Sequence, residues 1–155
     1  MEQQTRVTNL KCEYGINPIG IDQAAPRFSW QIESDLKGFT QKAYRLLIAS
    51  SSRILDLNMG DLWDSGKVIS NEQLGILYEG KTLQPMTRYE WKVMVWDGNG
   101  DAGSWSHSAW FLTGVQKVHQ WPGKFIRLFT GQVNFTRKEF DLASESEIAE
   151  AVSVK

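Results

Sequence analysis

The segment 83–97 constrains the fold more than any other part of this 155-residue sequence. Pro85 has no amide hydrogen to give to a sheet, so it belongs in a turn before a strand. Tyr89 then opens a run in which every second residue is aromatic or β-branched, as in a strand with one buried face. A Tyr at the start of such a strand buries its ring and returns its hydroxyl to the backbone of the preceding corner. This tyrosine corner is typical of β-sandwiches.

Similar short runs, separated by turn-forming residues, predict further strands along the chain. The expected strands cover residues 7–14, 27–33, 43–50, 62–69, 74–78, 89–96 and 109–113. Residues 15–26 contain several Gly and Pro and predict a loop, and residues 97–100 predict a hairpin turn. Residues 51–59 predict one short helix, capped by Ser51 or Ser52 and ended by Gly60.

These elements predict an all-β fold, a fibronectin type III or immunoglobulin-like β-sandwich over residues 1–114. Residues 115–123 predict a linker, and residues 124–155 predict a C-terminal extension of a few strands, the truncated start of a second β-sandwich domain. The alternative, in which the tail folds back onto the first sandwich, stays open. The expected core of the first sandwich consists of Phe28, Trp30, Tyr44, Leu46, Ile48, Tyr89, Trp91, Val93 and Phe111.

The composition excludes several classes of partner and site. The 17 Lys and Arg nearly balance the 18 Asp and Glu, so neither nucleic acid nor a membrane surface is an expected partner. No run is long and apolar enough to cross a bilayer. Cys12 is the only cysteine, which excludes an internal disulfide and a cysteine-rich zinc site, and we expect it to be a core thiol.

The first residues bear on cellular location. Residues 1–4 are polar and lack the basic and then apolar segments of a signal peptide. We therefore expect a cytoplasmic location if Met1 is the natural start, and a periplasmic or secreted location if Met1 replaces a removed signal peptide. The sequence leaves both open.

Asp61 and Asp64, on either side of Trp63, are the best local pair of carboxylates for acid–base chemistry. The alternative is structural: Asp side chains at the start of a strand cap backbone amides while the Trp packs inward. We favour the structural alternative, because no second charged cluster accompanies the pair. His107 and His119 are isolated from other metal ligands. No catalytic residue, metal or cofactor is therefore assigned.

The sequence holds seven Trp, which are the main departure from an average composition. Met94 and Trp96 fall on the face of their strand opposite Tyr89, so they are expected to leave the core and form an outer patch. Together with Trp63 and Trp105 they are the candidate residues for docking a neighbouring domain or for stacking on a sugar. We favour docking, because exposed apolar patches usually mark protein contacts.

Several short phrases, taken in order, carry a resemblance. The corner LQPMTRY at 83–89 resembles that of fibronectin type III domains. The further phrases are LKCEY at 10–14, NPIGID at 17–22, PRFSW at 26–30, QKAYRLLIA at 41–49, GDLWDSGKV at 60–68, YEWKV at 89–93 and VWD at 95–97. The ordered set resembles the N-terminal fibronectin-like domain of bacterial α-L-rhamnosidases. WPGKFI at 121–126 and FTRKEF at 135–140 are similar to the beginning of that family's next β-sandwich module.

The resemblance implies a parent enzyme that removes terminal L-rhamnose from plant glycans with inversion. It also implies that catalysis takes place in an (α/α)₆ barrel with acidic residues, and no such barrel is present in this sequence. No catalytic residue is therefore carried over, and the chain alone is expected to be inactive. The implied partners are the downstream domains of the same polypeptide and rhamnose-containing glycans.

Three functions follow from these observations. The first, which we favour, is a non-catalytic module that packs against later domains of a rhamnosidase. The second is a carbohydrate-binding module that uses exposed Trp residues. The third is a small glycosidase in its own right that uses Asp61 and Asp64.

Overall fold

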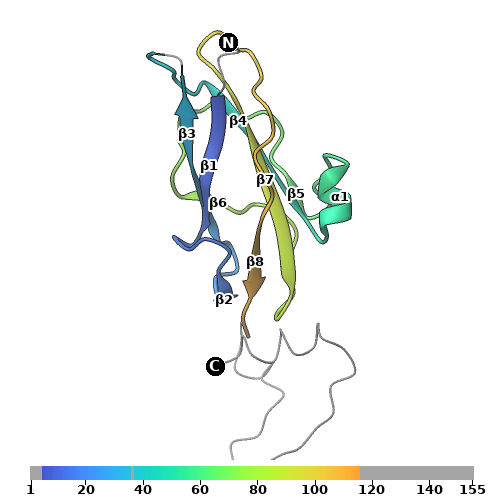
Figure 1. Ribbon diagram of the computed structural model, residues 1–155. Coiled ribbons are helices and arrows are strands. Elements are labelled where there is room, and N and C mark those ends of the chain that lie inside the picture. Colours follow the sequence, from blue (N-terminus) through green and yellow to red (C-terminus); the bar gives the residue numbers. More distant parts are fainter. Residues whose placement is uncertain (1–4, 36, 116–155) are drawn as a thin grey trace, which may run out of the picture. The chain divides into compact units, whose positions relative to one another are not determined.

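The computed structural model describes residues 5–35 and 37–115, and these form a two-layered β-sandwich (Figure 1). The strands are β1 (Thr5–Cys12), β2 (Ile19–Ile21), β3 (Arg27–Ser34), β4 (Ala43–Ala49), β5 (Trp63–Asp64), β6 (Ile76–Leu77), β7 (Arg88–Trp96) and β8 (Ala109–Thr113), and the helix is α1 (Ser52–Asp56). The all-β sandwich is confirmed. The chain divides into units 1–122 and 123–155. The second unit lies outside the described residues, so the linker at 115–123 and the second sandwich at 124–155 stay predictions.

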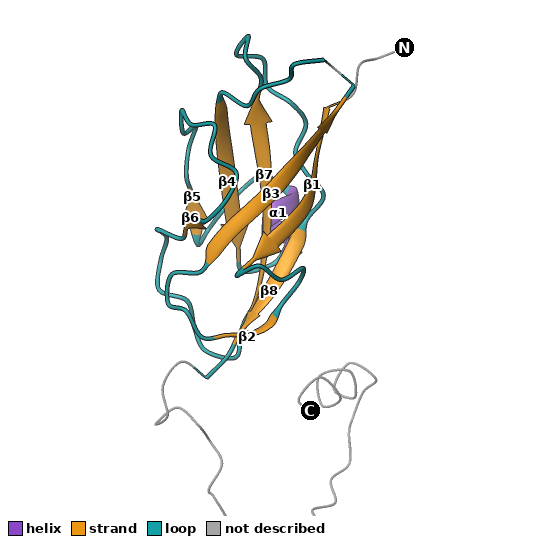
Figure 2. Cartoon of the chain, turned by 90° about the vertical axis from the view of Figure 1, so that its left-hand side faces the viewer, coloured by secondary structure: helices purple, strands orange, loops and turns teal. Residues whose placement is uncertain are grey.

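The two sheets have three and five strands. The smaller sheet has the order β1-β3-β6, and the larger has the order β2-β8-β7-β4-β5. Figure 2 shows β1 and β3 crossing in front of β4 and β7, as expected for two sheets packed face to face. All pairings are antiparallel except that of β2 with β8, which is parallel.

The core lies between the sheets because the inward positions of β4 and β7 are in register. Leu46 pairs with Val93 and Ile48 with Trp91. Phe28 of β3 meets Trp91 edge-on at a ring distance of 4.8 Å, which is a favourable arrangement for aromatic rings. All nine residues that the sequence predicted for the core are buried.

The tyrosine corner is also confirmed. Tyr89 is 3% exposed, and its hydroxyl accepts a hydrogen bond of 2.8 Å from the backbone N–H of Gln84. The carbonyl of Gln84 accepts a second bond, of 2.6 Å, from the Thr113 hydroxyl. The corner is therefore fixed both to the strand that follows it and to the end of β8.

Strand β2 is a correction to the predicted loop at 15–26. It has three residues, Gly20 within it has a φ of 82°, and it pairs with β8 through backbone bonds. Beyond it, the backbone N–H of Gly114 donates to the Ile21 carbonyl at 2.9 Å. Such a short segment lacks the side-chain alternation by which strands are recognised in a sequence.

Three further elements are shorter than expected, and the strand predicted at 74–78 is regular only in β6. The strand predicted at 62–69 is regular only in β5, because the chain turns at Gly66 (φ 62°) and meets β4 again only through a single bridge at Val68. The helix begins as predicted, with the Ser51 hydroxyl accepting from the N–H of Ile54. It ends at Asp56 rather than near Gly60, because Asn58 takes the left-handed conformation (φ 58°) that terminates helices.

Candidate functional site

The surface of the larger sheet that points away from β1, β3 and β6 is hereafter called the outer face. Its residues follow from the alternation along β4 and β7: Arg45 pairs with Met94, and Ala43 pairs with Trp96. Met94 and Trp96 are half-buried, as the sequence predicted for residues opposite the core. The two residues therefore lie side by side with the outward residues of β4.

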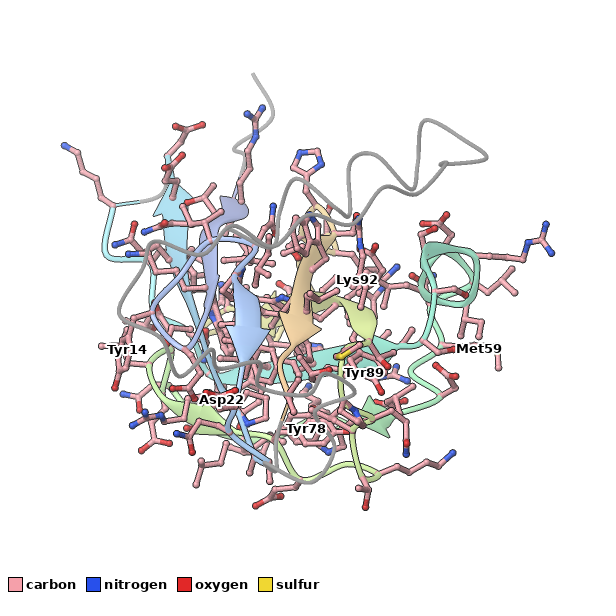
Figure 3. All side chains as sticks on the ribbon, turned by 90° about the horizontal axis from the view of Figure 1, so that it is seen from below. Tyr14, Asp22, Met59, Tyr78, Tyr89 and Lys92 are labelled. Atoms are coloured by element: carbon pink, nitrogen blue, oxygen red, sulfur yellow. The ribbon has the colours of Figure 1, made fainter. Side chains whose placement is uncertain are left out.

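Helix α1 covers one part of the outer face. Leu55 of α1 packs with Leu47 of β4 in a second, smaller apolar cluster, and Trp105 packs against its rim. Lys92 lies on the outer side of β7, towards α1 (Figure 3), and its ammonium group donates a 2.7 Å hydrogen bond to the Asn58 side chain. Trp105 therefore belongs to the same face as Met94 and Trp96.

Each outer-face Trp ring has a cation above it. Trp110 of β8 also belongs to this face, because it pairs with the outward Glu90. The distances from the charged group to the ring centroid are 4.6 Å for Lys67 over Trp96, 5.1 Å for Lys92 and 5.9 Å for Arg45 over Trp105, and 4.5 Å for Arg88 over Trp110. Such pairs contribute about 0.5–1 kcal/mol at exposed sites. Burial lowers the pKa of Lys92, although the charge of Asp56 opposes this effect. Cations thus lie over the indole rings of the outer face.

Trp63 does not belong to this face. It pairs with Ile48, an inward residue of β4, and its side chain packs against the main core. Its ring meets Tyr78 edge-on at 5.5 Å. Of the four residues that the sequence grouped together, the structure brings together Met94, Trp96 and Trp105 but separates Trp63 from them. A role of Trp63 in docking or in sugar stacking therefore stays a prediction, separate from that of the other three residues.

Asp61 and Asp64 are both engaged in local structure. Asp61 accepts hydrogen bonds from the backbone N–H and the hydroxyl of Ser50, at 2.9 and 2.7 Å. Asp64 accepts two bonds from the Arg45 guanidinium and one from the N–H of Gly66. The hydrogen bond from Arg45 is the main cause of the lowered pKa of Asp64. A general acid needs a raised pKa, so this geometry supports the structural alternative.

The His and Cys residues of the described part of the chain do not form a metal site or a catalytic cluster. His107 is exposed, whereas His119 and Trp121 lie outside the described residues. Within residues 5–35 and 37–115, no three His, Cys, Asp or Glu side chains gather as metal ligands do. Cys12 is buried, and its desolvation raises the pKa of the thiol to about 12. No helix in the described part of the chain is long and apolar enough to span a membrane.

Sequence reasoning missed the cations of the outer face. Lys67 and Arg45 come from segments far from Trp96 and Trp105 along the chain, and only the strand register brings them together. Arg88 is the exception, because it lies on the strand next to Trp110 in a predictable hairpin-like pairing.

Comparison with known proteins identifies the fold's relatives. The family described as the Rha78A-like N-terminal immunoglobulin domain matches residues 7–117. The chain belongs to this family. It is 44% identical over 121 residues to an α-L-rhamnosidase of Streptomyces avermitilis, an alignment that covers 78% of this chain and 12% of that protein. The resemblance to the N-terminal domain of α-L-rhamnosidases is confirmed.

Solved structures of the family agree with the sequence match. An α-L-rhamnosidase from Dictyoglumus thermophilum superposes with a TM-score of 0.74 at 40% identity, over 77% of this chain and 13% of that one. The Streptomyces avermitilis enzyme, solved in complex with L-rhamnose, gives a TM-score of 0.73 at 43% identity, over 77% and 12%. The chain thus spans about an eighth of the length of these relatives.

Proposed function

We propose that this chain is the non-catalytic N-terminal module of an α-L-rhamnosidase and that it supports the downstream catalytic domain by packing against it. The observation that carries the proposal is the family match together with the small share of each relative, 12–13%, that the chain covers. The parent enzyme would release terminal L-rhamnose from glycans. Its catalytic carboxylates would lie in the remaining part of the polypeptide.

The outer face is the proposed packing surface. Met94, Trp96 and Trp105 give it apolar area, and the cations above the rings give it positive groups that hydrogen-bond to a neighbouring domain. Aromatic residues, Met and Arg are enriched where protein surfaces meet. The composition of this face therefore fits a contact between domains.

Sugar stacking on the same rings is less favoured. A pyranose ring packs its C–H groups on the flat face of an indole, but Lys67 lies over Trp96, and Arg45 and Lys92 lie over Trp105. Arg45 is also held in place by its ion pair with Asp64. A stacked sugar would have to displace these cations, whereas a protein surface can contact them.

Hydrolysis of p-nitrophenyl α-L-rhamnoside is the first test. We expect no turnover by the 155-residue chain and turnover by the same chain when it is joined to the downstream part of its polypeptide. Turnover by the short chain, lost in Asp64→Asn, would instead support the small-glycosidase hypothesis.

Packing is tested in the full-length protein with Trp96→Ala and Met94→Ala. In calorimetry, we expect the N-terminal module of each variant to unfold in a transition of its own, at a lower temperature than the remaining domains. The reason is that each substitution weakens the contact that couples the module to those domains. The matched control is Leu77→Ala, since Leu77 is 55% exposed on the smaller sheet. Unchanged coupling in the outer-face variants would contradict the proposed packing surface.

A further inference from the structure

A cleft of about 440 Å³ lies at the edge of the sandwich formed by β5 and β6. These strands end the larger and the smaller sheet respectively, and each has only two residues, so the edge between the sheets is open. The cleft is lined by Tyr44, Trp63, Glu72 and Glu79, among others. Its volume is within the range of roughly 300–1,000 Å³ that small-ligand sites occupy.

Three polar groups in the cleft have no partner within the described part of the chain. The Tyr44 hydroxyl makes no hydrogen bond there, and the carboxylates of Glu72 and Glu79 make neither a hydrogen bond nor an ion pair. Glu72 and Glu79 line the same cleft as Tyr44, and the pKa of Tyr44 is raised chiefly by burial and then by the charges of these two carboxylates. In contrast, the neighbouring Asp64 is fully engaged with Arg45 and Gly66.

Trp63 is half-buried and lines this cleft. Tyr78 supports the ring edge-on. Gly80 passes so close that an added Cβ would lie 2.6 Å from the Cβ of Trp63, and a Cβ added at Gly60 would lie still closer to the Trp63 carbonyl oxygen. The ring is therefore in position before any ligand arrives, which reduces the entropy lost on binding.

We propose that this cleft binds the ring of a neutral sugar, with one apolar side against Trp63 and its hydroxyls donating to Glu72, Glu79 and the Tyr44 hydroxyl. The hydroxyls of a sugar can donate to each of these oxygen acceptors. An anion is excluded by the two carboxylates. A simple cation gains little, because Glu72 and Glu79 are exposed and surface ion pairs are weak. This site is separate from the outer face and does not depend on the proposed packing role.

NMR titration of the 155-residue chain tests the proposal. The probes are the methyl glycosides of L-rhamnose, D-glucose and D-galactose, with methylammonium chloride as the charged comparison. We expect saturable shifts of the Trp63 indole N–H and of the amides at 44, 72 and 79 with at least one sugar. The proposal is overturned by an absence of shifts, by shifts confined to the indoles of Trp96 and Trp105, or by saturation with methylammonium alone.

Variants assign the binding to these side chains. Glu72→Gln combined with Glu79→Gln, and separately Tyr44→Phe, should each weaken sugar binding at least tenfold while the remaining spectrum stays folded. Trp63→Ala is less suitable, because Trp63 also packs against the core. The matched control is Glu33→Gln, an exposed carboxylate of β3 outside the cleft, which should leave binding unchanged. Equal binding by the control and the cleft variants would overturn the proposal and leave the packing role untouched.

Discussion

The indole N–H of Trp30 donates a 3.0 Å hydrogen bond to the side-chain carbonyl of Gln41, and both residues are buried. The amide of Gln41 donates in turn to the backbone carbonyls of Ser70 and Glu72, at 3.0 and 2.9 Å. One side chain thus satisfies the polar atom of a core Trp and holds a segment without regular structure. That segment carries Glu72, so the same amide also positions one wall of the proposed sugar cleft.

Gln41→Leu should destabilise the protein strongly. It leaves the Trp30 indole and two backbone carbonyls without their partner, and an unpaired buried group costs roughly 1–3 kcal/mol. We expect a loss of at least about 2 kcal/mol in urea unfolding. Gln23→Leu, at an exposed position, is the control and should have little effect. A loss no larger than that of the control would mean that the network contributes nothing to stability.

Tyr89→Phe should lower the free energy of unfolding by about 1 kcal/mol, the usual contribution of one hydrogen bond. The ring stays, and only the bond from the Gln84 N–H to the hydroxyl is lost. Tyr14→Phe is the matched control, because Tyr14 is 71% exposed. Chemical denaturation measures the free energy of unfolding of both variants. Equal values for Tyr89→Phe and Tyr14→Phe would show that the bond between Gln84 and Tyr89 does not contribute to stability.

Cys12 should react with a thiol reagent only when the protein unfolds. The thiol is buried, and its pKa is raised to about 12, so almost no thiolate exists in the folded protein near neutral pH. We expect the rate of labelling by a chromogenic disulfide to follow the unfolded fraction as urea is raised. Rapid labelling of the chain in the absence of urea would contradict the assigned burial.

Glu13 should make stability depend on pH in the acid range. Its carboxylate binds Arg27 through the guanidinium and the backbone N–H, and chiefly the side-chain bond lowers the pKa of Glu13 below its ordinary value of 4.5. A lowered folded-state pKa stabilises above the unfolded pKa, and this contribution is lost as pH falls through the folded pKa.

We therefore expect the free energy of unfolding at neutral pH to be higher for the wild type than for Glu13→Gln, by about 1 kcal/mol, because Arg27 is exposed and solvent screens the pair. The difference should shrink as pH falls below 4.5. Urea unfolding of both proteins across this range measures it. A difference independent of pH would show that the charge of Glu13 is not involved.

The core was predictable because alternation alone decides which side chains of a strand share a face. This alternation correctly predicted that Tyr89 and Trp91 lie in the interior and that Met94 and Trp96 lie on the opposite side of the same strand. The inward packing of Trp63, which the structural alternative for Asp61 and Asp64 favoured, could not be derived from its own strand pattern. Its face depends on its pairing with Ile48 of β4, and the register between two separate segments is not contained in the pattern of either one.

The polar contacts between distant segments were harder to predict from the sequence than the apolar core. Gln41 lies outside any strand, and nothing in its neighbours along the chain indicates that it will meet Trp30. The proposed cleft likewise joins Tyr44 to Glu72 and Glu79, which lie in segments far from it along the chain. Such contacts depend on where loops return to the sandwich, and loops have no periodic pattern from which this can be deduced.

Strand β2 affects how the domain responds to a pulling force. It runs parallel to β8, and its bonds to β8 and Gly114 lie where the chain leaves the sandwich. On the other side, Thr113 is joined to the carbonyls of Gln84 and Thr87. Tension applied through the end of β8 would therefore shear two rows of bonds together instead of opening them one at a time.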